Sequence, residues 1–383
     1  MTEEDLLEAT KQLVAIPSTS HDPQALQQAL DFMAARVWNA CPDVTVERFE
    51  SNGIPSFLAY RGTKRPDKFH LILNGHLDVV PGKPEQYKAV IKDGKLYGRG
   101  VYDMKAACII LADVFCEFVN KVPYALGLQI VTDEESAGQD GTLHQINQGV
   151  RADFVISGEC GRTVGTHEIA NEAKGIVVAN VGFRGTAAHS AYPWKGDNAV
   201  LKALDFISAL HERYPVPVEP SGETLVSVTA MSADSGAHSK LPDYSTVKIA
   251  ARYVAGDADF KNRRHFKSLV EAMHPEAEIV DIHDFTQPIY TSPYSPLIVA
   301  LKDSAEKVEG APFSFVRRHG TGDGRFYGAV GNEACEFGIA GDYSHGDSEY
   351  VTLEAFRYYH ATLRDFLEKT MADANKRRST KTV

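Results

Sequence analysis

The stretch Leu71-Ile-Leu-Asn-Gly-His-Leu-Asp-Val-Val80 decides how the rest of the chain is interpreted. Its apolar start predicts a buried strand over Phe69–Leu73, which ends at Gly75 and is followed by His76 and Asp78. Residues i and i+2 of an extended chain point to the same face, so the imidazole and the carboxylate leave the strand end together. This suits a metal ligand with its partner, or a base with its orienting acid. A polar turn after a core strand is the alternative, and these two residues alone do not decide between them.

The composition is typical of a globular protein and argues against several classes of partner. The chain has 383 residues, enough for two domains, with 43% hydrophobic and 24% charged residues. Its net charge of -11 argues against nucleic acid or an anionic membrane surface as the main partner. No segment approaches the roughly 20 apolar residues that span a membrane. The start, Met1–Val14, does not resemble a signal peptide.

Cysteine usage predicts a reducing compartment. The five cysteines are few, odd in number and without a C-x-x-C pair. We therefore expect a cytoplasmic protein without disulfides. The last residues, Lys376–Val383, are predicted to form a frayed polar tail.

Alternating strand and helix patterns predict an α/β domain. The expected helices and strands up to residue 157 are helices at Glu3–Ala15, Asp22–Ala40, Met104–Asn120 and Gly141–Asn147, and strands at Val44–Phe49, Ser56–Arg61, Phe69–Leu73, Leu126–Thr132 and Asp153–Ser157. This order predicts a mostly parallel sheet with helices on both faces. Near the end of the chain, the same domain is expected to continue with a helix at Ser295–Glu309 capped by Ser295, a strand at Ala334–Ile339 and a long helix at Ser348–Ala374.

The pattern changes near Gly175. Between residues 176 and 285 the order of predicted elements is β-α-β-β-α-β, the ferredoxin-like split unit. A block of this size can fold as its own domain. We therefore expect one domain formed by residues 1–175 and 286–383, with a second domain of residues 176–285 inserted into it.

Acidic and imidazole side chains recur where the predicted strands end. Ligands of open α/β sheets bind in the crevice beyond the carboxyl ends of the strands. The residues at these positions are His76, Asp78, Glu134, Glu135, Glu159 and His345, with Asp103 in a turn before a helix. Histidines and carboxylates without cysteine favour zinc, or cobalt and manganese. So many carboxylates suggest two metals, about 3.5–4 Å apart, that share one carboxylate. Adjacent side chains on an extended segment point opposite ways, so one of Glu134 and Glu135 can bind metal while the other acts as base.

The segments that carry these residues resemble a known family. They are Asn74-Gly-His-Leu-Asp-Val-Val-Pro81, Tyr97-Gly-Arg-Gly-Val-Tyr-Asp-Met-Lys105, Thr132-Asp-Glu-Glu135, Ser157-Gly-Glu159, Gly182-Phe-Arg-Gly-Thr-Ala-Ala-His-Ser-Ala-Tyr-Pro193, Gly320-Thr-Gly-Asp-Gly-Arg-Phe326 and Gly341–Glu349. Together they resemble the dinuclear zinc family of aminoacylases and carboxypeptidases, which includes succinyl-diaminopimelate desuccinylase, acetylornithine deacetylase and the glutamate carboxypeptidases. The resemblance covers nearly the whole chain in order.

The resemblance implies a role for each matching residue. His76 and Glu159 are expected to bind one metal, Glu135 and His345 the other, Asp103 to bridge both, Asp78 to orient His76, and Glu134 to act as general base. The inserted domain is implied to be a lid and dimerisation domain of a homodimer. His189 in this domain is expected to stabilise the oxyanion in the site of the partner subunit. Arg252, Gly320 and Thr321 are expected to contact the substrate carboxylate.

The implied activity is hydrolysis of the amide bond of a small N-acyl amino acid by a metal-bridged hydroxide, with Glu134 taking its proton. A carboxypeptidase or dipeptidase is the alternative. Three segments depart from the expected patterns. The Arg-Arg-Gly-Ser of the desuccinylases is here Ala173-Lys-Gly-Ile176, and the family's Asn-Val-Ile-Pro is Ser239-Lys-Leu-Pro242. The Trp-x-x-x-Pro-Phe segment usual before the Gly-rich turn is here Tyr87-Lys-Ala-Val-Ile91. These departures argue against diaminopimelate as the substrate.

Two other functions compete with hydrolysis. The turn Gly98-Arg-Gly100 could cradle a nucleotide, but it lacks the third glycine, and Asp103 would repel a phosphate. A binding protein without activity on the same fold would be expected to have lost ligands or base, and all of them are present.

Overall fold

The computed structural model describes residues 1–219 and 221–380, and the chain divides into two compact units. The first unit consists of Met1–Glu172, Tyr290–Arg318 and Gly322–Val383, and the second of Ala173–Ile289 and His319–Thr321. The insertion that we expected at residues 176–285 lies inside the second unit, which extends beyond it to Ala173 and Ile289. Each unit has its own hydrophobic cluster.

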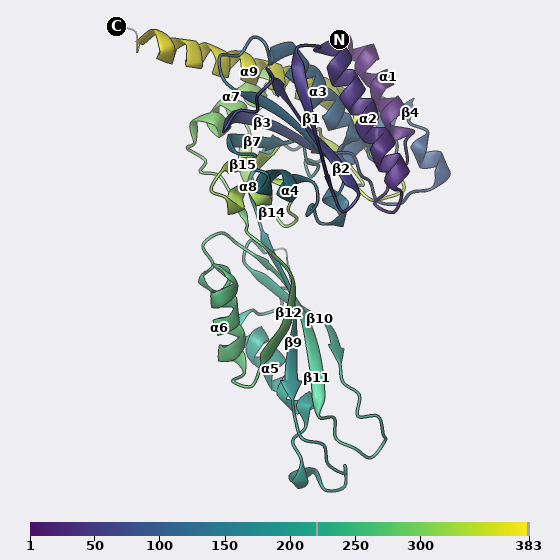
Figure 1. The fold of residues 1–383 in the computed structure, drawn as a ribbon, viewed down its shortest axis with the longest axis vertical. Helices are drawn as coiled ribbons and strands as arrows, with labels where there is room; N and C mark the ends of the chain where they lie inside the picture. The colour runs from purple at the N-terminus through teal and green to yellow at the C-terminus, as the bar shows by residue number, and fades with distance from the viewer. Residues whose placement is uncertain (220, 381–383) are drawn as a thin grey trace. The chain divides into compact units, whose positions relative to one another are not determined.

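The first unit is organised around one large sheet (Figure 1). Its strands are β1 (Val44–Ser51), β2 (Ile54–Arg61), β3 (Phe69–His76), β6 (Leu126–Val131), β7 (Ala152–Ser157), β8 (Glu168–Ala173), β13 (Ile289–Tyr290), β14 (Ser314–Arg318) and β15 (Glu333–Glu336). They follow the order β1-β2-β6-β3-β7-β15-β8-β13, and β14 also pairs with β8. The central strands β6, β3, β7 and β15 are parallel, whereas β1, β2 and β8 pair antiparallel. The predicted α/β class with a mostly parallel central sheet is confirmed.

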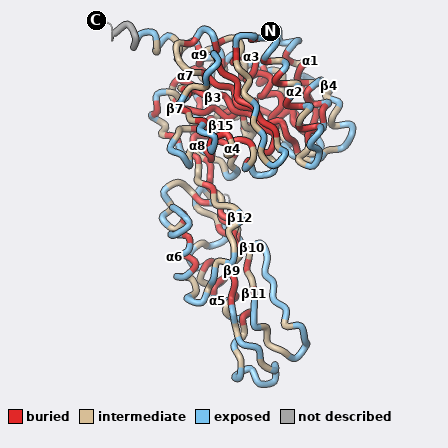
Figure 2. The backbone as a smooth tube through the Cα atoms, in the orientation of Figure 1, coloured by how far each residue is buried: buried red, intermediate tan, exposed pale blue. Residues whose placement is uncertain are grey.

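Helices cover both faces of this sheet. They are α1 (Glu3–Val14), α2 (Pro23–Ala40), α3 (Ala106–Phe118), α4 (Thr142–Asn147), α7 (Pro296–Glu309), α8 (Gly324–Ala329) and α9 (Leu353–Thr380). One face packs against α1, α2, α3, α7 and α9 in a single cluster of buried side chains. Figure 2 colours the backbone of buried residues red. On the other face, α4 and α8 approach through polar contacts, because Gln145 and Tyr327 both hydrogen bond to Gln129 on β6.

Helix α3 is largely apolar and almost wholly buried, apart from one stripe on which Asp113 and Glu117 pair with His360 and Arg364. We expected it to begin at Met104, but it begins at Ala106. The preceding turn, Val101–Lys105, contains non-helical backbone angles at Asp103 and Met104 and a cis peptide bond between them. This turn presents Asp103 before the helix starts.

The elements near the end of the chain differ from the prediction in three details. Ser295 precedes α7 but makes no capping hydrogen bond, because its hydroxyl donates to Glu333 instead. Helix α9 begins at Leu353 rather than Ser348, because Tyr350–Thr352 forms a strand, β17. The helix then continues to Thr380, so residues 376–380 are helical rather than frayed. Residues 381–383 of the predicted tail lie outside the described part of the chain.

A small sheet that the sequence did not predict sits beside the main one. It pairs β16 (Gly341–Asp342), β17, β5 (Lys95–Tyr97) and β4 (Val90–Lys92) in that order. The pairing of β17 with β5 joins the start of the Asp103 turn to the segment that follows His345.

The second unit is a four-stranded antiparallel sheet with two helices. Its elements are β9 (Gly175–Arg184), α5 (Ala199–Arg213), β10 (Leu225–Ser232), β11 (Tyr244–Tyr253), α6 (Arg263–Met273) and β12 (Glu278–Thr286). The strand order β10-β11-β9-β12 is that of a ferredoxin-like split unit. Burial alternates along β9 and β11, so one face of this sheet packs against the helices. Within the described residues, no helix of either unit combines the length and apolar character needed to cross a bilayer.

Candidate metal centre

Three segments with acidic or imidazole side chains follow parallel strands at one edge of the main sheet. Strand β3 ends with His76, β6 is followed by the turn Glu134–Ser136, and β7 is followed by Glu159. Because β3 pairs in parallel with both β6 and β7, these segments leave the sheet at the same edge. This is the crevice in which open α/β sheets bind ligands.

One group of possible ligands consists of His76, Asp103 and Glu159. Nε2 of His76 lies 3.1 Å from Oδ1 of Asp103 and 3.7 Å from Oε2 of Glu159. The three ligand atoms lie within 4.8 Å of one another. Oε2 of Glu159 is buried and has no hydrogen-bond partner among the described residues. A buried carboxylate oxygen without a partner is costly unless a cation meets it.

A second group consists of Asp103, Glu135 and His345. Nε2 of His345 lies 3.2 Å from Oδ2 of Asp103 and 3.0 Å from Oε1 of Glu135. Asp103 therefore belongs to both groups and faces each with a different oxygen atom. Its position is what a carboxylate shared by two metal ions requires.

The charges of the site fit cations. Burial and the nearby charge of Asp103 raise the pKa of Glu159 well above its ordinary value. Hydrogen bonds to Asp103 and Glu135 raise the pKa of His345 to about 10. Burial disfavours the charged form of Asp103, yet hydrogen bonds from His345 and His76 outweigh it and hold the pKa of Asp103 far below its usual range. Carboxylates outnumber imidazoles here, and histidine with carboxylate is a donor set that zinc, cobalt and manganese accept.

Asp78 holds two parts of the site in place. Its carboxylate is fully buried and lies 3.4 Å from Nδ1 of His76, which also faces the Asp78 carbonyl at 3.0 Å. With Nδ1 held in this way, Nε2 is turned toward the ligand group. The same carboxylate accepts hydrogen bonds from the backbone N–H groups of Glu134 and Glu135. Asp78 thus orients one ligand and fixes the turn that carries another.

Glu134 lies beside the ligand groups but belongs to neither. Burial, with a contribution from nearby Asp323, raises the pKa of Glu134 to about 8. Its Oε1 lies 3.4 Å from Nη1 of Arg325, a buried side chain that also donates to the carbonyl of Ala137. Of the pair Glu134 and Glu135, Glu135 is therefore the one placed to bind metal.

A buried ion pair that sequence reasoning missed supports the Asp103 turn. The carboxylate of Glu349 accepts hydrogen bonds from the N–H groups of Gly100, Tyr102 and Asp103 and from Nη1 of Arg99 at 2.7 Å. Arg99 also donates to the carbonyl of His345. Both residues stand inside segments that we quoted for the family resemblance, and the available signal was Arg99, a charged side chain between two glycines. The Gly98–Gly100 turn, which could have cradled a nucleotide, is therefore hydrogen bonded to groups inside the protein.

The remaining predicted site residues all belong to the second unit and join neither ligand group. His189 is exposed, and its Nδ1 accepts a hydrogen bond from the N–H of Ala191. Arg252 is exposed on β11, and Gly320 and Thr321 lie in the short segment that this unit takes from the later part of the chain.

Three features define a metal-dependent hydrolase. They are the main sheet, the two ligand groups that share an aspartate, and the adjacent glutamate. The chain belongs to the family described as Peptidase family M20/M25/M40, whose model matches residues 72–369. It is a metallohydrolase that acts on the amide bonds of small acyl amino acids or peptides. The predicted family, enzyme class and reaction are confirmed.

Individual relatives agree with this assignment. A succinyl-diaminopimelate desuccinylase of Buchnera aphidicola subsp. Acyrthosiphon pisum is 26% identical over 400 aligned positions, which cover 96% of this chain and 99% of that protein. The structure is similar to that of an aminopeptidase, PepT, from Bacillus cereus, with a TM-score of 0.76, 18% identity and coverage of 96% and 98% of the two chains. It is also similar to an M20 family metallo-carboxypeptidase from Sulfolobus solfataricus, with a TM-score of 0.74, 18% identity and coverage of 95% and 98%.

Asp78→Ala should weaken metal binding and lower activity by about 10–100-fold, because it removes the support of His76 and leaves two N–H groups without an acceptor. Calorimetric titration of the metal-free protein with Zn²⁺ and a rate assay would measure both effects. Asp31→Ala removes an exposed carboxylate that pairs with Arg48 and serves as the matched control. Unchanged metal affinity in Asp78→Ala would contradict the role given to this residue.

Proposed function

We propose that this chain is a deacylase that cleaves small N-acyl amino acids with two divalent metal ions, with zinc as the native metal. The observation that carries the proposal is the shared position of Asp103 between the two ligand groups, next to the buried oxygen of Glu159 that has no hydrogen-bond partner. His76 and Glu159 would hold one ion, Glu135 and His345 would hold the other, and Asp103 would contribute to both. When bound, the ions supply Lewis acidity toward the amide carbonyl and a water-derived nucleophile at neutral pH.

Glu134 carries the proton in this reaction. It accepts the proton of the attacking water and delivers it to the nitrogen atom of the leaving amine. Its partly buried carboxylate, close to the ligands yet outside both groups, supports this role. Arg325 lies against Oε1 of Glu134 and limits the directions that the carboxylate can take.

The substrate proposal rests on relatives and on one position of the second unit. The most similar relatives include desuccinylases, and the similar structures include an aminopeptidase and a carboxypeptidase. Lys174 stands where desuccinylases have an arginine-rich segment, and here its buried ammonium donates to the carbonyls of Ser221 and Glu223. A side chain engaged in this way does not recognise a succinyl group. We therefore propose a substrate other than N-succinyl-diaminopimelate, with a dipeptide as the second candidate.

His189 completes the proposed site from a second subunit. The ligands and the base all come from the first unit, whereas His189 is exposed on the second. The second unit also exposes apolar side chains on α5, Leu201 at 58% and Leu204 at 48%, and ends its sheet with the open edge strand β10. Such features suit an interface. We propose a homodimer formed through residues 176–285, with His189 stabilising the oxyanion of the partner's reaction.

A substrate panel should separate the deacylase from the peptidase. N-succinyl, N-acetyl and N-formyl amino acids and a set of dipeptides would each be assayed with Zn²⁺, Co²⁺ and Mn²⁺. We expect the N-acyl amino acids to give higher kcat/KM than the dipeptides and N-succinyl-diaminopimelate to be a poor substrate. Turnover confined to dipeptides would favour the second candidate.

Glu134→Gln should keep the fold and both metals but lose about 10²–10⁴-fold in kcat, because it removes the carboxylate proposed to transfer the proton. Elemental analysis and a rate assay on the same sample would show this combination. Glu135→Gln is the matched control, since the same chemical change at the neighbouring residue should reduce metal content. A kcat near that of the unmodified enzyme, with metals bound, would refute the assignment of the base.

His345→Ala should lower the metal content from two ions toward one. The remaining group of His76, Asp103 and Glu159 stays complete, so one ion should be retained. Elemental analysis after dialysis would count the ions, with His144→Ala as a control at a distant histidine. Two tightly bound ions in His345→Ala would disprove the ligand assignment.

His189→Ala should lose about 10²–10³-fold in kcat, the usual effect of removing an oxyanion donor. If His189 acts in the partner's site, mixing inactive His189→Ala with inactive Glu134→Gln under subunit exchange should restore part of the activity, because some heterodimer sites contain both residues. Exchange would be verified with differently tagged subunits. Verified exchange without recovered activity would refute action between subunits.

A further inference from the structure

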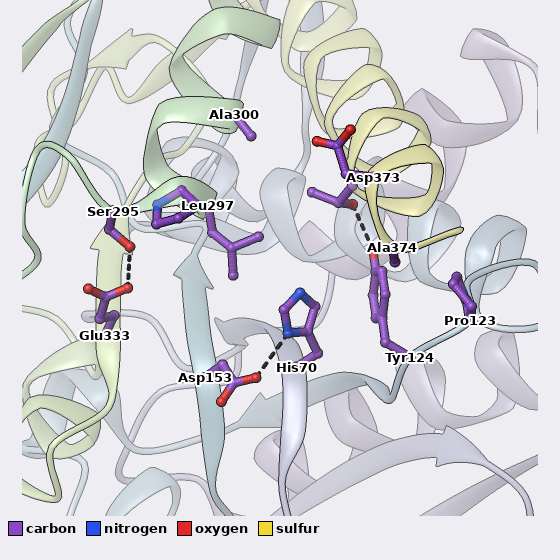
Figure 3. Close-up of a pocket in the computed structure, with 12 residues that line it drawn as sticks. His70, Pro123, Tyr124, Asp153, Ser295, Leu297, Ala300, Glu333, Asp373 and Ala374 are labelled. Carbon is purple, nitrogen blue, oxygen red and sulfur yellow. Dashed lines mark hydrogen bonds and ion pairs between the residues drawn. The ribbon is translucent and has the colours of Figure 1, made fainter. Parts of the chain in front are cut away.

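A cavity of 410 Å³ lies in the first unit at the edge of the main sheet opposite the metal centre (Figure 3). Its volume falls within the range of about 300–1,000 Å³ of small-molecule sites. His70 lines it near the start of β3, the strand whose other end carries His76. Asp153 and Glu333 line it from the starts of β7 and β15. None of the proposed catalytic residues takes part in this cavity.

The walls are largely apolar and are held in place by polar contacts. Leu297 and Ala300 come from the first turns of α7, and Tyr124 from the loop before β6. The hydroxyl of Tyr124 hydrogen bonds with that of Thr370 on α9 at 2.7 Å, and its ring meets the ring of His70 edge-on with centroids 4.7 Å apart. A ligand would therefore meet a preformed aromatic and aliphatic surface.

The polar groups of the cavity accept hydrogen bonds. Nδ1 of His70 is engaged with Asp153 at 2.9 Å, and in Figure 3 its other ring nitrogen faces the space between Leu297 and Tyr124. With the proton on Nδ1, that second nitrogen is an acceptor. The charge of the Asp153 carboxylate is balanced by Lys68, whose Nζ lies 2.6 Å from Oδ1.

Two further carboxylates leave the cavity negative. Glu333 accepts a hydrogen bond from the hydroxyl of Ser295, and no cation of the described residues forms an ion pair with it. Asp373 is exposed and, among the described side chains, forms an ion pair across one turn of α9 with Lys376 at 3.8 Å. Exposed ion pairs of this kind contribute little to stability. The lining thus offers an apolar surface bordered by hydrogen-bond acceptors, among them Glu333, with which no cation of the described residues pairs.

We propose that this cavity binds a small amphipathic amine, with its apolar body against Tyr124 and Leu297 and its ammonium group beside Glu333, across the cavity from Asp373 (Figure 3). An anion of the same shape would be repelled by the two carboxylates. An amine without an apolar body would leave the walls uncovered and would bind weakly, because burial of apolar surface provides most of the affinity in such pockets. The site is separate from the proposed deacylase reaction and does not depend on it.

Tryptamine is a suitable probe, because it joins an aromatic body to a primary ammonium. Calorimetry on the full-length, metal-loaded protein should show saturable binding at one site. Indole-3-propionate, with the same ring system and a carboxylate, should bind at least about tenfold more weakly, since one charge-assisted hydrogen bond is worth that much. Ethylamine should show no measurable binding. Equal binding of the cationic and anionic indoles would overturn the proposal, as would no binding of tryptamine at millimolar concentration.

Substitutions in the lining test whether tryptamine binds in this cavity. Glu333→Gln should weaken tryptamine by about tenfold, whereas Glu50→Gln, the same change at an exposed residue of β1, should leave it unaltered. Leu297→Trp should fill the cavity and abolish binding. Should this variant not fold, as judged by circular dichroism, Asp373→Lys on the exposed face of α9 provides the second test and should also weaken tryptamine. Binding that survives Glu333→Gln and Asp373→Lys, or that disappears only when a chelator removes the metals, would overturn the assignment.

Discussion

The position of Asp103 depends on the buried carboxylate of Glu349. Three backbone N–H groups of the turn before α3 donate to it, and without this acceptor they would be buried without partners, a costly state. Arg99 balances the charge and also holds the carbonyl of His345. One interaction therefore positions the shared aspartate and the histidine of the second candidate group, although these residues lie in distant parts of the sequence. Both ligand groups depend on it through the aspartate that they share, whereas Asp78 holds His76 and the turn that carries Glu135.

The negative charge of the site also shapes the surrounding interior. Burial raises the pKa of Asp133 and of Glu336 to about 7, and both lie close to the ligand groups. Arg325 is the buried cation that faces this cluster from α8. Metal ions bound at the two groups would lower the cost of so many buried carboxylates, because binding free energy at such sites adds to the free energy of folding. Occupancy by metal and the stability of this region are therefore expected to be coupled.

The sequence predicted the parts of the site that depend on local patterns. Strand β3 and its terminal His76 were predicted because an apolar run ends there, and Glu134, Glu135 and Glu159 because each follows such a run. The support of the Asp103 turn by Glu349 was missed, since nothing local connects residues so far apart. The same reason applies to the small sheet of β5 and β17, whose strands are too short to show periodicity. The start of α3 was misplaced because the apolar pattern runs through Met104, where the backbone is not helical.

The place of β15 in the main sheet has a consequence for the order of assembly. This strand pairs in parallel with β7 near the middle of the sheet, yet it is synthesised after the whole second unit. A nascent chain therefore carries β7 with an open edge, a surface prone to wrong pairing, until residues 333–336 emerge. The strands and helices of the second unit are contiguous in sequence and are complete earlier. Long-range pairing of this kind slows folding, so the second unit is expected to be native first and the catalytic sheet last.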